Sequence, residues 1–412
     1  MRYFFNKDYA FLQFGSISIS IIFINQFSGW PVLRFWNISG IDSGFNRFND
    51  LSIVLNAAEC YPIYGNKVYL ENFHCGNYLY GTFLLKLVEF LNVRHINIYI
   101  LGLLLAIFLV ISTIYFTSHA LRKGHLAFVL LIFFAPPFHL MVQRGHIDIV
   151  IFSIVSLSLY LFRKKYNYSA ILLLFLTVLF KFYTLPLLLY FSLSKRSRSF
   201  RFFSITLFIC SLFLIRQDLA VTPVKVGQLY TGRIWGLFGW RTIVDRLNET
   251  ATIQLNNFQS SFLSLLIFTI AYFIIYNLLK YFLFTNDVSF QNSKNTTLHE
   301  EFYALSLVFL TCFFAGTNYD FRLYFGVIAG IVFMRISQLS RRVSALFMAL
   351  LLLISWLSFE SGGLEIFGDV FVLILVVVYL EYWRINFVRG RFNFRVKIKT
   401  LIEKNIDFFE IV

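Results

Sequence analysis

The sequence predicts an all-α polytopic membrane protein, and three observations support this prediction. Of its 412 residues, 58% are hydrophobic and only 14% are charged. The mean hydropathy of +0.71 lies far above the range of soluble proteins. The apolar stretches are continuous and do not alternate with a period of two, which argues against an outer-membrane barrel.

The number of apolar stretches predicts the kind of membrane fold. A spanning helix needs about 20 apolar residues, and roughly twelve stretches approach that length, some of them short or broken by proline. Neither an internal repeat nor the strand–helix alternation of a soluble nucleotide-binding domain is present, so we expect a single membrane domain over 1–412. The stretches lie near 9–26, 96–117, 125–142, 147–162, 169–180, 183–194, 200–216, 261–284, 302–316, 323–337, 343–358 and 367–383.

The net charge of +15 is distributed in a way that argues against nucleic-acid binding. Basic clusters such as 163–165 and 195–198 occupy alternate connections, which the positive-inside rule places in the cytoplasm. Both termini are then cytoplasmic, and we expect a multi-pass protein of the inner (plasma) membrane. The basic tail 384–412 is expected to contact anionic lipid headgroups, so membrane lipids are the predicted partners and nucleic acid is not.

The opposite side of the membrane carries two long loops, 27–95 and 217–260. Within the first loop, apolar residues recur at helical spacing over 50–59 and again over 79–91. Helices of this length cannot span a bilayer but suit its interface. Between them, 61–69 is rich in turn-forming residues, so we expect a turn there.

The four cysteines show no metal-ligand spacing, and we expect neither a metal nor a cofactor. Cys210 and Cys312 fall inside predicted helices, where we expect them to fill the core. Cys60 and Cys75 share the first outer loop, and they are either free or joined to each other. Closing this loop of about 15 residues would contribute on the order of 3 kcal/mol. No glycine-rich nucleotide-binding motif is present.

Four polar clusters fall on the predicted outer side, and we expect them to converge. Asp50 begins the first amphipathic helix, Lys181 separates two short apolar stretches, and the other two clusters head or join helices. The clusters are Asp50, Gln143-Arg144-Gly145-His146-Ile147-Asp148, Lys181, and Asn318-Tyr319-Asp320-Phe321-Arg322.

These motifs resemble the GT-C superfamily of integral-membrane glycosyltransferases, nearest the family of polyprenyl-phosphate-mannose-dependent α-mannosyltransferases. Arg144–Asp148 is similar to that family's Arg-Gly-Asn-x-Asp, with His146 in the place of Asn. Lys181–Pro186 is similar to its Lys-x-x-Pro, with the proline later than usual. The resemblance covers about 8–201 in order and spacing. The residues that match the family's pattern after its first helix are Asp50-Leu51, Ala57-Ala58, Gly65, Tyr69 and Tyr78-Leu79-Tyr80-Gly81.

The resemblance implies a GT-C-like fold and an inverting transfer of a hexose, with mannose the sugar of the nearest family. The donor would be a polyprenyl-phosphate sugar, and the acceptor a lipid or glycan. Asp50 would be the general base, which must lie within about 3 Å of the attacking hydroxyl. Cations must hold the leaving phosphate, where negative charge develops. The candidates for substrate binding are Lys181, Arg144, Arg322, Asp148, His146 and Asp320.

Each candidate also has a purely structural interpretation. Asp50 is placed to be an exposed N-cap of the helix that follows it. Lys181 is placed to extend its ammonium group from a helix end toward the interface. His146 has the alternative of a structural polar residue.

The remaining clusters have local alternatives as well. Arg144 and Asp148 are close enough in sequence to pair with each other at a membrane edge. Asp320 and Arg322 are placed to close a turn as a local ion pair. Their functional and structural interpretations predict different partners for the same side chains.

The second outer loop supports a separate prediction and keeps two other functions open. Arg233 and Arg241 flank a Trp-rich segment that could stack on sugars, or that could be an interfacial aromatic belt. O-antigen-type polysaccharide polymerases and ligases also rely on outer-loop arginines. A lipid or glycan transporter is the non-enzymatic alternative, and it would need charged residues lining a path through the helices.

Overall fold

The structure is a computed structural model that describes part of the chain. The described residues are 48–65, 68, 78, 80–93, 96–120, 135–194, 196–229, 237–239, 242, 244, 255–284, 296–315, 318–319, 322–337, 341–357 and 367–385.

The regular elements of the described chain are helices and one short antiparallel ladder, in which Leu237 pairs with Tyr319 and Phe238 with Asn318. A further helix covers 367–385. The other elements are α3 (Asn49–Tyr64), α4 (Thr82–Phe90), α5 (Ile98–Ala120), α7 (Pro136–Arg144), α8 (Asp148–Arg163), α9 (Asn167–Phe180), η4 (Phe182–Thr184), α10 (Leu185–Ser192), α11 (Arg198–Leu229), β1 (Leu237–Phe238), α13 (Asn257–Phe284), α14 (Thr296–Phe314), β2 (Asn318–Tyr319), α15 (Leu323–Ile336) and α16 (Arg341–Leu357).

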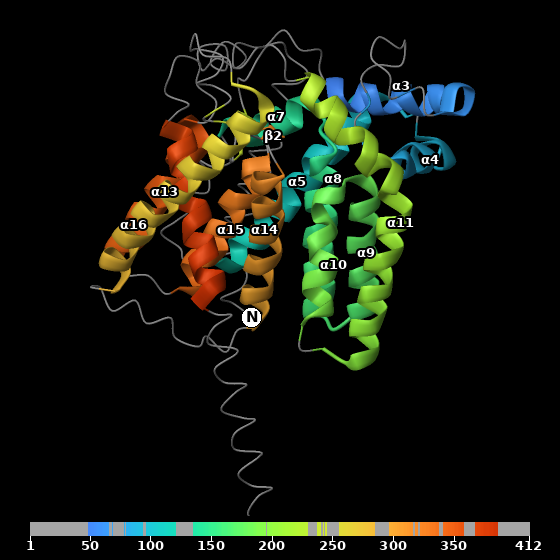
Figure 1. The fold of residues 1–412 in the computed structure, drawn as a ribbon. Coiled ribbons are helices and arrows are strands. Elements are labelled where there is room, and N and C mark those ends of the chain that lie inside the picture. The colour runs from blue at the N-terminus through green and yellow to red at the C-terminus, as the bar shows by residue number, and fades with distance from the viewer. Residues whose placement is uncertain are drawn as a thin grey trace, which may run out of the picture.

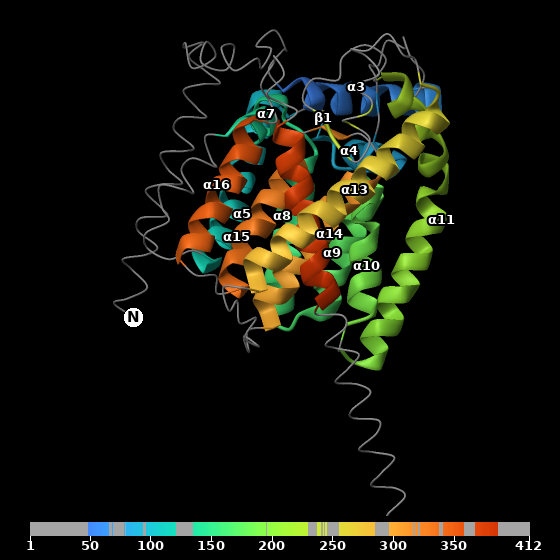
Figure 2. The ribbon, with the colours of Figure 1, turned by 60° about the vertical axis from the view of Figure 1, so that its left-hand side comes forward.

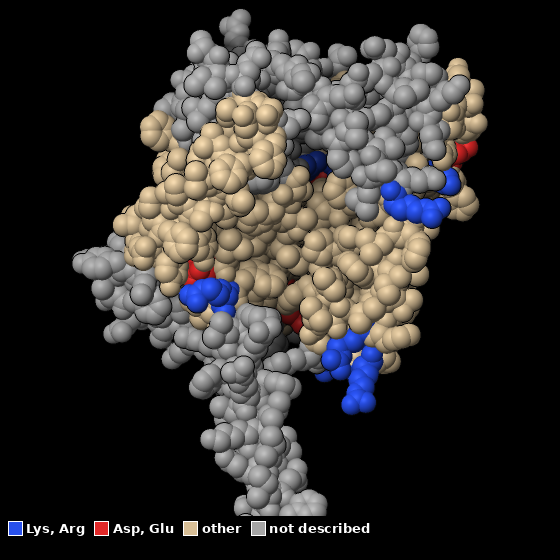
Figure 3. All heavy atoms as spheres, viewed as in Figure 1, with Lys and Arg blue, Asp and Glu red and all other residues tan. Residues whose placement is uncertain are grey.

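The structure confirms a helical membrane protein. Within the described residues, three helices are long and apolar enough to cross a bilayer, over Ile98–Thr117, Arg198–Arg216 and Phe258–Leu278. The bent pair of α7 and α8 would make a fourth span. Large apolar side chains that a soluble protein would bury are exposed on α11 and α13. On the face shown in Figure 3, a band without Lys, Arg, Asp or Glu separates charged side chains near the two ends of the described surface.

Long helices run roughly parallel, and α3, α4 and α7 lie across one end of them (Figures 1 and 2). α5 and α8 both start at this end, α9 ends there, and α15 starts there, so the four polar clusters of the sequence fall on one side. α14 packs closely on α15, because Gly326 leaves room for the ring of Phe309.

Three helices have bounds that differ from those expected from the sequence. α11 continues to Leu229, well into the predicted second outer loop 217–260. α3 continues through the expected turn to Tyr64, and Gly65 ends it with a φ of +55° that suits glycine. The expected span 125–142 contains the separate helix α7, which lies at 110° to α8.

The cysteines divide into bonded and free. Cys60, in α3, is disulfide-bonded. Cys75, its expected partner, lies outside the described residues. Cys312 is a free, buried thiol, as expected for a core residue, whereas Cys210 is free but exposed. The prediction of a core position was therefore wrong for Cys210, since α11 exposes much of its apolar surface.

Candidate functional site

The start of α3 is held in place by close contacts with two other helices. The backbone N–H of Phe48 donates to the carbonyl of Gln143, at 2.8 Å. The Phe48 ring lies against Gly102 of α5, where a Cβ atom would overlap it. Phe48 itself adopts a φ of +56°, unusual for a bulky residue. Asp50, two residues later, therefore sits on a backbone fixed by α5 and α7.

Gly145 explains why an Arg-Gly pair ends α7. Its φ of +60° is the left-handed conformation that ends a helix, and only glycine adopts it without strain. A Cβ at this position would lie 3.0 Å from the Cβ of Leu51, so the close approach of α3 also requires glycine. The turn thereby directs Arg144 toward α3 and starts α8 at Asp148.

Asp50 is a buried carboxylate that is bound by Arg144. The guanidinium Nε donates to Oδ2 at 2.9 Å, and Nη2 donates to Oδ1 at 2.7 Å. The Asp50 side chain is 6% exposed and that of Arg144 is 17% exposed. The N-cap of α3 is Phe48, so Asp50 is neither a cap nor an exposed residue. Its structural alternative from the sequence is therefore wrong.

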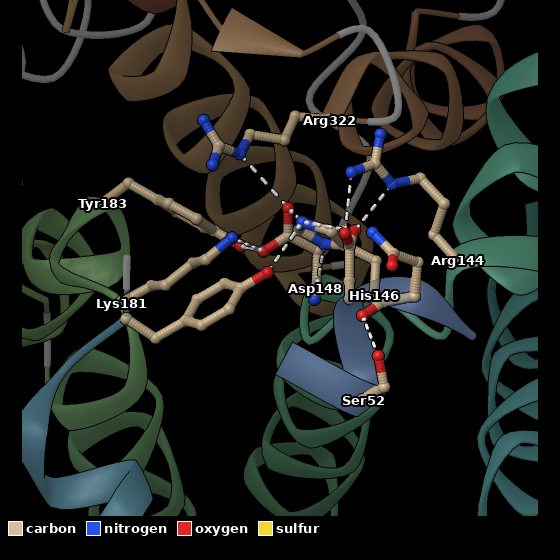
Figure 4. Close-up of polar contacts among 10 residues, drawn as sticks. Ser52, Arg144, His146, Asp148, Lys181, Tyr183 and Arg322 are labelled. Carbon is tan, nitrogen blue, oxygen red and sulfur yellow. Dashed lines mark hydrogen bonds and ion pairs between the residues drawn. The ribbon is translucent and has the colours of Figure 1, made fainter. Parts of the chain in front are cut away.

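Asp148 is the centre of a second group of contacts (Figure 4). Its side chain is fully buried, and its Oδ1 accepts from the Lys181 ammonium at 2.8 Å and from the Tyr183 hydroxyl at 2.7 Å. Its Oδ2 accepts from Nε of Arg322 at 3.1 Å. Lys181 and Arg322 are thus held by one carboxylate, and neither interaction is local in sequence.

His146 lies between the two carboxylates. The backbone N–H of Asp148 donates to its Nδ1 at 3.1 Å, and its Nε2 lies 3.7 Å from Oδ2 of Asp50. Burial, reinforced by the charge of Lys181, lowers the pKa of His146 to about 4. The ring is therefore neutral near pH 7, and its Nδ1 also lies 3.3 Å from Oδ2 of Asp148.

Tyr80 and Lys181 lie next to each other in the site. The N–H of Gly81 donates to the carbonyl of Phe180 at 3.2 Å, which ties the chain before α4 to the end of α9. The ammonium of Lys181 consequently lies 4.6 Å from the centre of the Tyr80 ring, and the Tyr80 hydroxyl lies 3.4 Å from Nε2 of His146. Burial lowers the pKa of Lys181 to about 8, despite its contact with Asp148. Burial also raises the pKa of Tyr80 well above its usual value, so the phenol is neutral.

The charges of these groups leave an excess that suits an anion. Three cations, from Arg144, Lys181 and Arg322, surround the two carboxylates of Asp50 and Asp148. With His146 neutral, these five charged groups of the described chain sum to one excess positive charge in a largely buried setting. In the described part of the chain, no group of three or more His, Cys, Asp and Glu side chains could hold a metal ion. The arrangement therefore favours binding of a phosphate-like anion next to a carboxylate.

The structure brings together six of the predicted residues from four separate segments: Asp50, Arg144, His146, Asp148, Lys181 and Arg322. Asp320, Arg233 and Arg241 lie outside the described residues. The β1–β2 ladder nevertheless brings 237–238 of the second outer loop to the turn that precedes Arg322.

Tyr80 and Tyr183 are members of the site that the sequence analysis did not name as candidate site residues, although Tyr80 belongs to the segment that matches the family's pattern. The available signals were weak. Tyr80 belongs to an aromatic-rich segment of the first outer loop, and Tyr183 follows Lys181 by two residues. Neither signal specifies a contact with a buried carboxylate.

An apolar groove of about 590 Å³ lies between α5 and α8 and is separate from the polar cluster. Val150, Ile154 and Leu157 line it from α8. Residues two apart face opposite sides of a helix, so Val150 points away from the carboxylate of Asp148. We therefore do not count the groove as part of the site.

Comparison with known proteins adds no relative: no family model matches the chain, and no curated protein and no solved structure is similar to it.

Proposed function

We propose that this protein is an inverting hexosyltransferase that uses a polyprenyl-phosphate sugar and transfers the sugar to a lipid or glycan acceptor. In this proposal the fold is GT-C-like, with about twelve spanning helices in an inner (plasma) membrane. Both termini are cytoplasmic, and the site faces the opposite side. The nearest family suggests mannose as the sugar.

One observation carries the proposal. A buried carboxylate, Asp50, lies beside a group of three cations at the end of an apolar helical bundle, and with Asp148 these charged groups of the described chain sum to one excess positive charge. A phosphate-linked lipid donor requires fixed positive charge where its leaving phosphate develops negative charge. It also requires this charge close to the membrane surface, because the lipid chain stays in the bilayer.

The proposed roles follow from the chemical groups that the site brings together. Arg144 has the planar fork that suits a phosphate, and Lys181 and Arg322 supply two further charges. Asp50 would accept the proton of the acceptor hydroxyl while the acceptor oxygen bonds to the sugar and the phosphate leaves. Asp148 would position the two cations that it binds. A single displacement needs one base, so Asp148 is not required to react.

The direct test is transfer of radiolabelled sugar from polyprenyl-phosphate mannose or glucose to membrane lipids. We expect transfer by the wild type and at least about a hundredfold less by Asp50→Asn, because a general base contributes about 10²- to 10⁴-fold. Glu59→Gln is the matched control, since Glu59 is an exposed acid on the same helix and should be dispensable.

The possible outcomes separate the alternatives. Full transfer by a folded Asp50→Asn protein would rule out Asp50 as the base. No transfer by either protein, with both folded and inserted, would favour a polysaccharide polymerase or a transporter.

A further inference from the structure

The contact between Asp50 and Arg144 is incompatible with the role of either residue in the reaction. Arg144 donates to both oxygens of Asp50, at 2.7 and 2.9 Å. A carboxylate in such a bidentate pair is poorly placed to take a proton from a hydroxyl. The guanidinium is likewise occupied on the edge formed by Nε and Nη2. In this state the base is blocked, and so is one of the proposed phosphate ligands.

The two ion-pair groups of the site differ in how easily they could open. Asp148 is fully buried and accepts from Lys181, Tyr183 and Arg322. For an incoming anion to take the place of this carboxylate, several of its partners would have to move together. The Asp50 pair involves one guanidinium, which is 17% exposed. An incoming anion would therefore exchange most readily at Arg144.

We propose that the donor phosphate and Asp50 compete for Arg144, so that binding of the donor releases the base. This inference rests on the proposed function and concerns the regulation of the same site. A phosphodiester matches the fork of Arg144 as the carboxylate does, and it would accept the hydrogen bonds that Asp50 gives up. Asp50 then faces the acceptor only after the donor is in place.

The released carboxylate lies next to His146. Nε2 of His146 is 3.7 Å from Oδ2 of Asp50, and the ring is fixed by the contact of its Nδ1 with the backbone N–H of Asp148. In the transfer step, the acceptor oxygen bonds to the sugar carbon and the bond from that carbon to the phosphate oxygen breaks. The acceptor proton moves to Asp50, and the electron pair leaves with the polyprenyl phosphate, which Arg144 holds.

The competition can be measured without any turnover. The probe is a short-chain polyprenyl methyl phosphodiester, which has the charge of the donor but no sugar to transfer. Its Kd is measured for the wild type, Asp50→Asn, Arg144→Gln and the double variant. We expect Asp50→Asn to bind the probe about tenfold more tightly than the wild type, although it cannot catalyse transfer. Arg144→Gln should bind it more weakly.

The double variant separates competition from simple charge repulsion. If Asp50 acts through Arg144, then Asp50→Asn should change the Kd by less than about threefold in the Arg144→Gln background. Equal tightening in both backgrounds would show a general charge effect and would overturn the inference. Unchanged or weaker binding by Asp50→Asn would also overturn it, and is the result expected if the pair only holds the fold together.

Two controls keep the result interpretable. Arg144→Lys keeps the positive charge but lacks the planar fork, and it substitutes for Arg144→Gln if the latter does not fold. In the Arg144→Lys background too, Asp50→Asn should tighten binding of the probe less than it does in the wild type. Glu59→Gln should leave the Kd unchanged. A folded wild type that does not bind the probe would instead refute the proposed function, and this inference would fall with it.

Discussion

Replacing Asp148 by asparagine should strongly destabilise the protein. The Asp148 side chain is fully buried and compensates two cations, with its oxygens 2.8 Å from Nζ of Lys181 and 3.1 Å from Nε of Arg322. In Asp148→Asn the charge is lost, and the new amide N–H group would face one of these donors. Removing one partner of a buried ion pair costs about 3 to 5 kcal/mol. We expect a loss of this size in the free energy of unfolding.

The assay is unfolding by SDS in mixed micelles, followed by tryptophan fluorescence. The second variant is Asp148→Asn combined with Lys181→Met, which removes a buried charge together with its partner. The double variant should be more stable than the sum of the two single changes predicts, by about 1 to 3 kcal/mol. Glu89→Gln, an exposed acid in α4, serves as the control. The reasoning would be refuted if Asp148→Asn stayed within about 1 kcal/mol of the wild type, or if the two changes were additive.

Further predictions concern Gly145, Lys181 and His146. Gly145→Ala should lose about 1 to 2 kcal/mol in the same unfolding assay, because alanine is strained at a φ of +60° and its Cβ would crowd Leu51; unchanged stability would contradict this. Transfer should decline above pH 8, because Lys181 has a pKa of about 8 and loses its charge there. Lys181→Arg should extend activity past about pH 10, because the guanidinium stays charged. A wild-type pH profile of transfer that is flat to that pH would contradict the role of the Lys181 charge. Over the same window, from about 8 to the ordinary 10.5, the contribution of Lys181 to stability should rise with pH, because only the unfolded chain keeps the proton. His146→Asn should retain most transfer, since an amide oxygen can accept the N–H of Asp148, whereas His146→Leu should lose it; equal activity of the two variants would show that this hydrogen bond is dispensable.

Which residues belong to the site was largely predictable from the sequence, because this depends only on the helix boundaries and on the side of the membrane. Alternating the connections by their charge placed Asp50, Arg144, Lys181 and Arg322 on one side. Their side chains do meet there. This level of prediction does not depend on how the helices pack.

The pairing of these residues was not predictable, because it depends on packing between segments far apart in the chain. The sequence offered Arg144 a neighbouring acid in Asp148, yet Arg144 binds Asp50, which is 94 positions away. The cause is the left-handed turn at Gly145, which points Arg144 and Asp148 to different partners. The extension of α11 to Leu229 was missed for another reason, since polar residues together with Pro223 and Gly227 interrupt the apolar stretch after Arg216.

The different surroundings of the two carboxylates determine which one can act as the base. Asp148 is fully buried, so an acceptor hydroxyl has no path to it, and its oxygens already accept from two cations and from the Tyr183 hydroxyl. Asp50 is held mainly by one guanidinium that is itself partly exposed, and the neutral ring of His146 lies on its other side. Environments that differ in this way are how active sites assign unlike roles to like groups. On this reasoning Asp148 organises the cations and Asp50 is the one of the two that can meet a substrate. Asp50→Asn should therefore lower transfer at least about a hundredfold and cost less stability than Asp148→Asn, because it leaves one cation without its carboxylate rather than two.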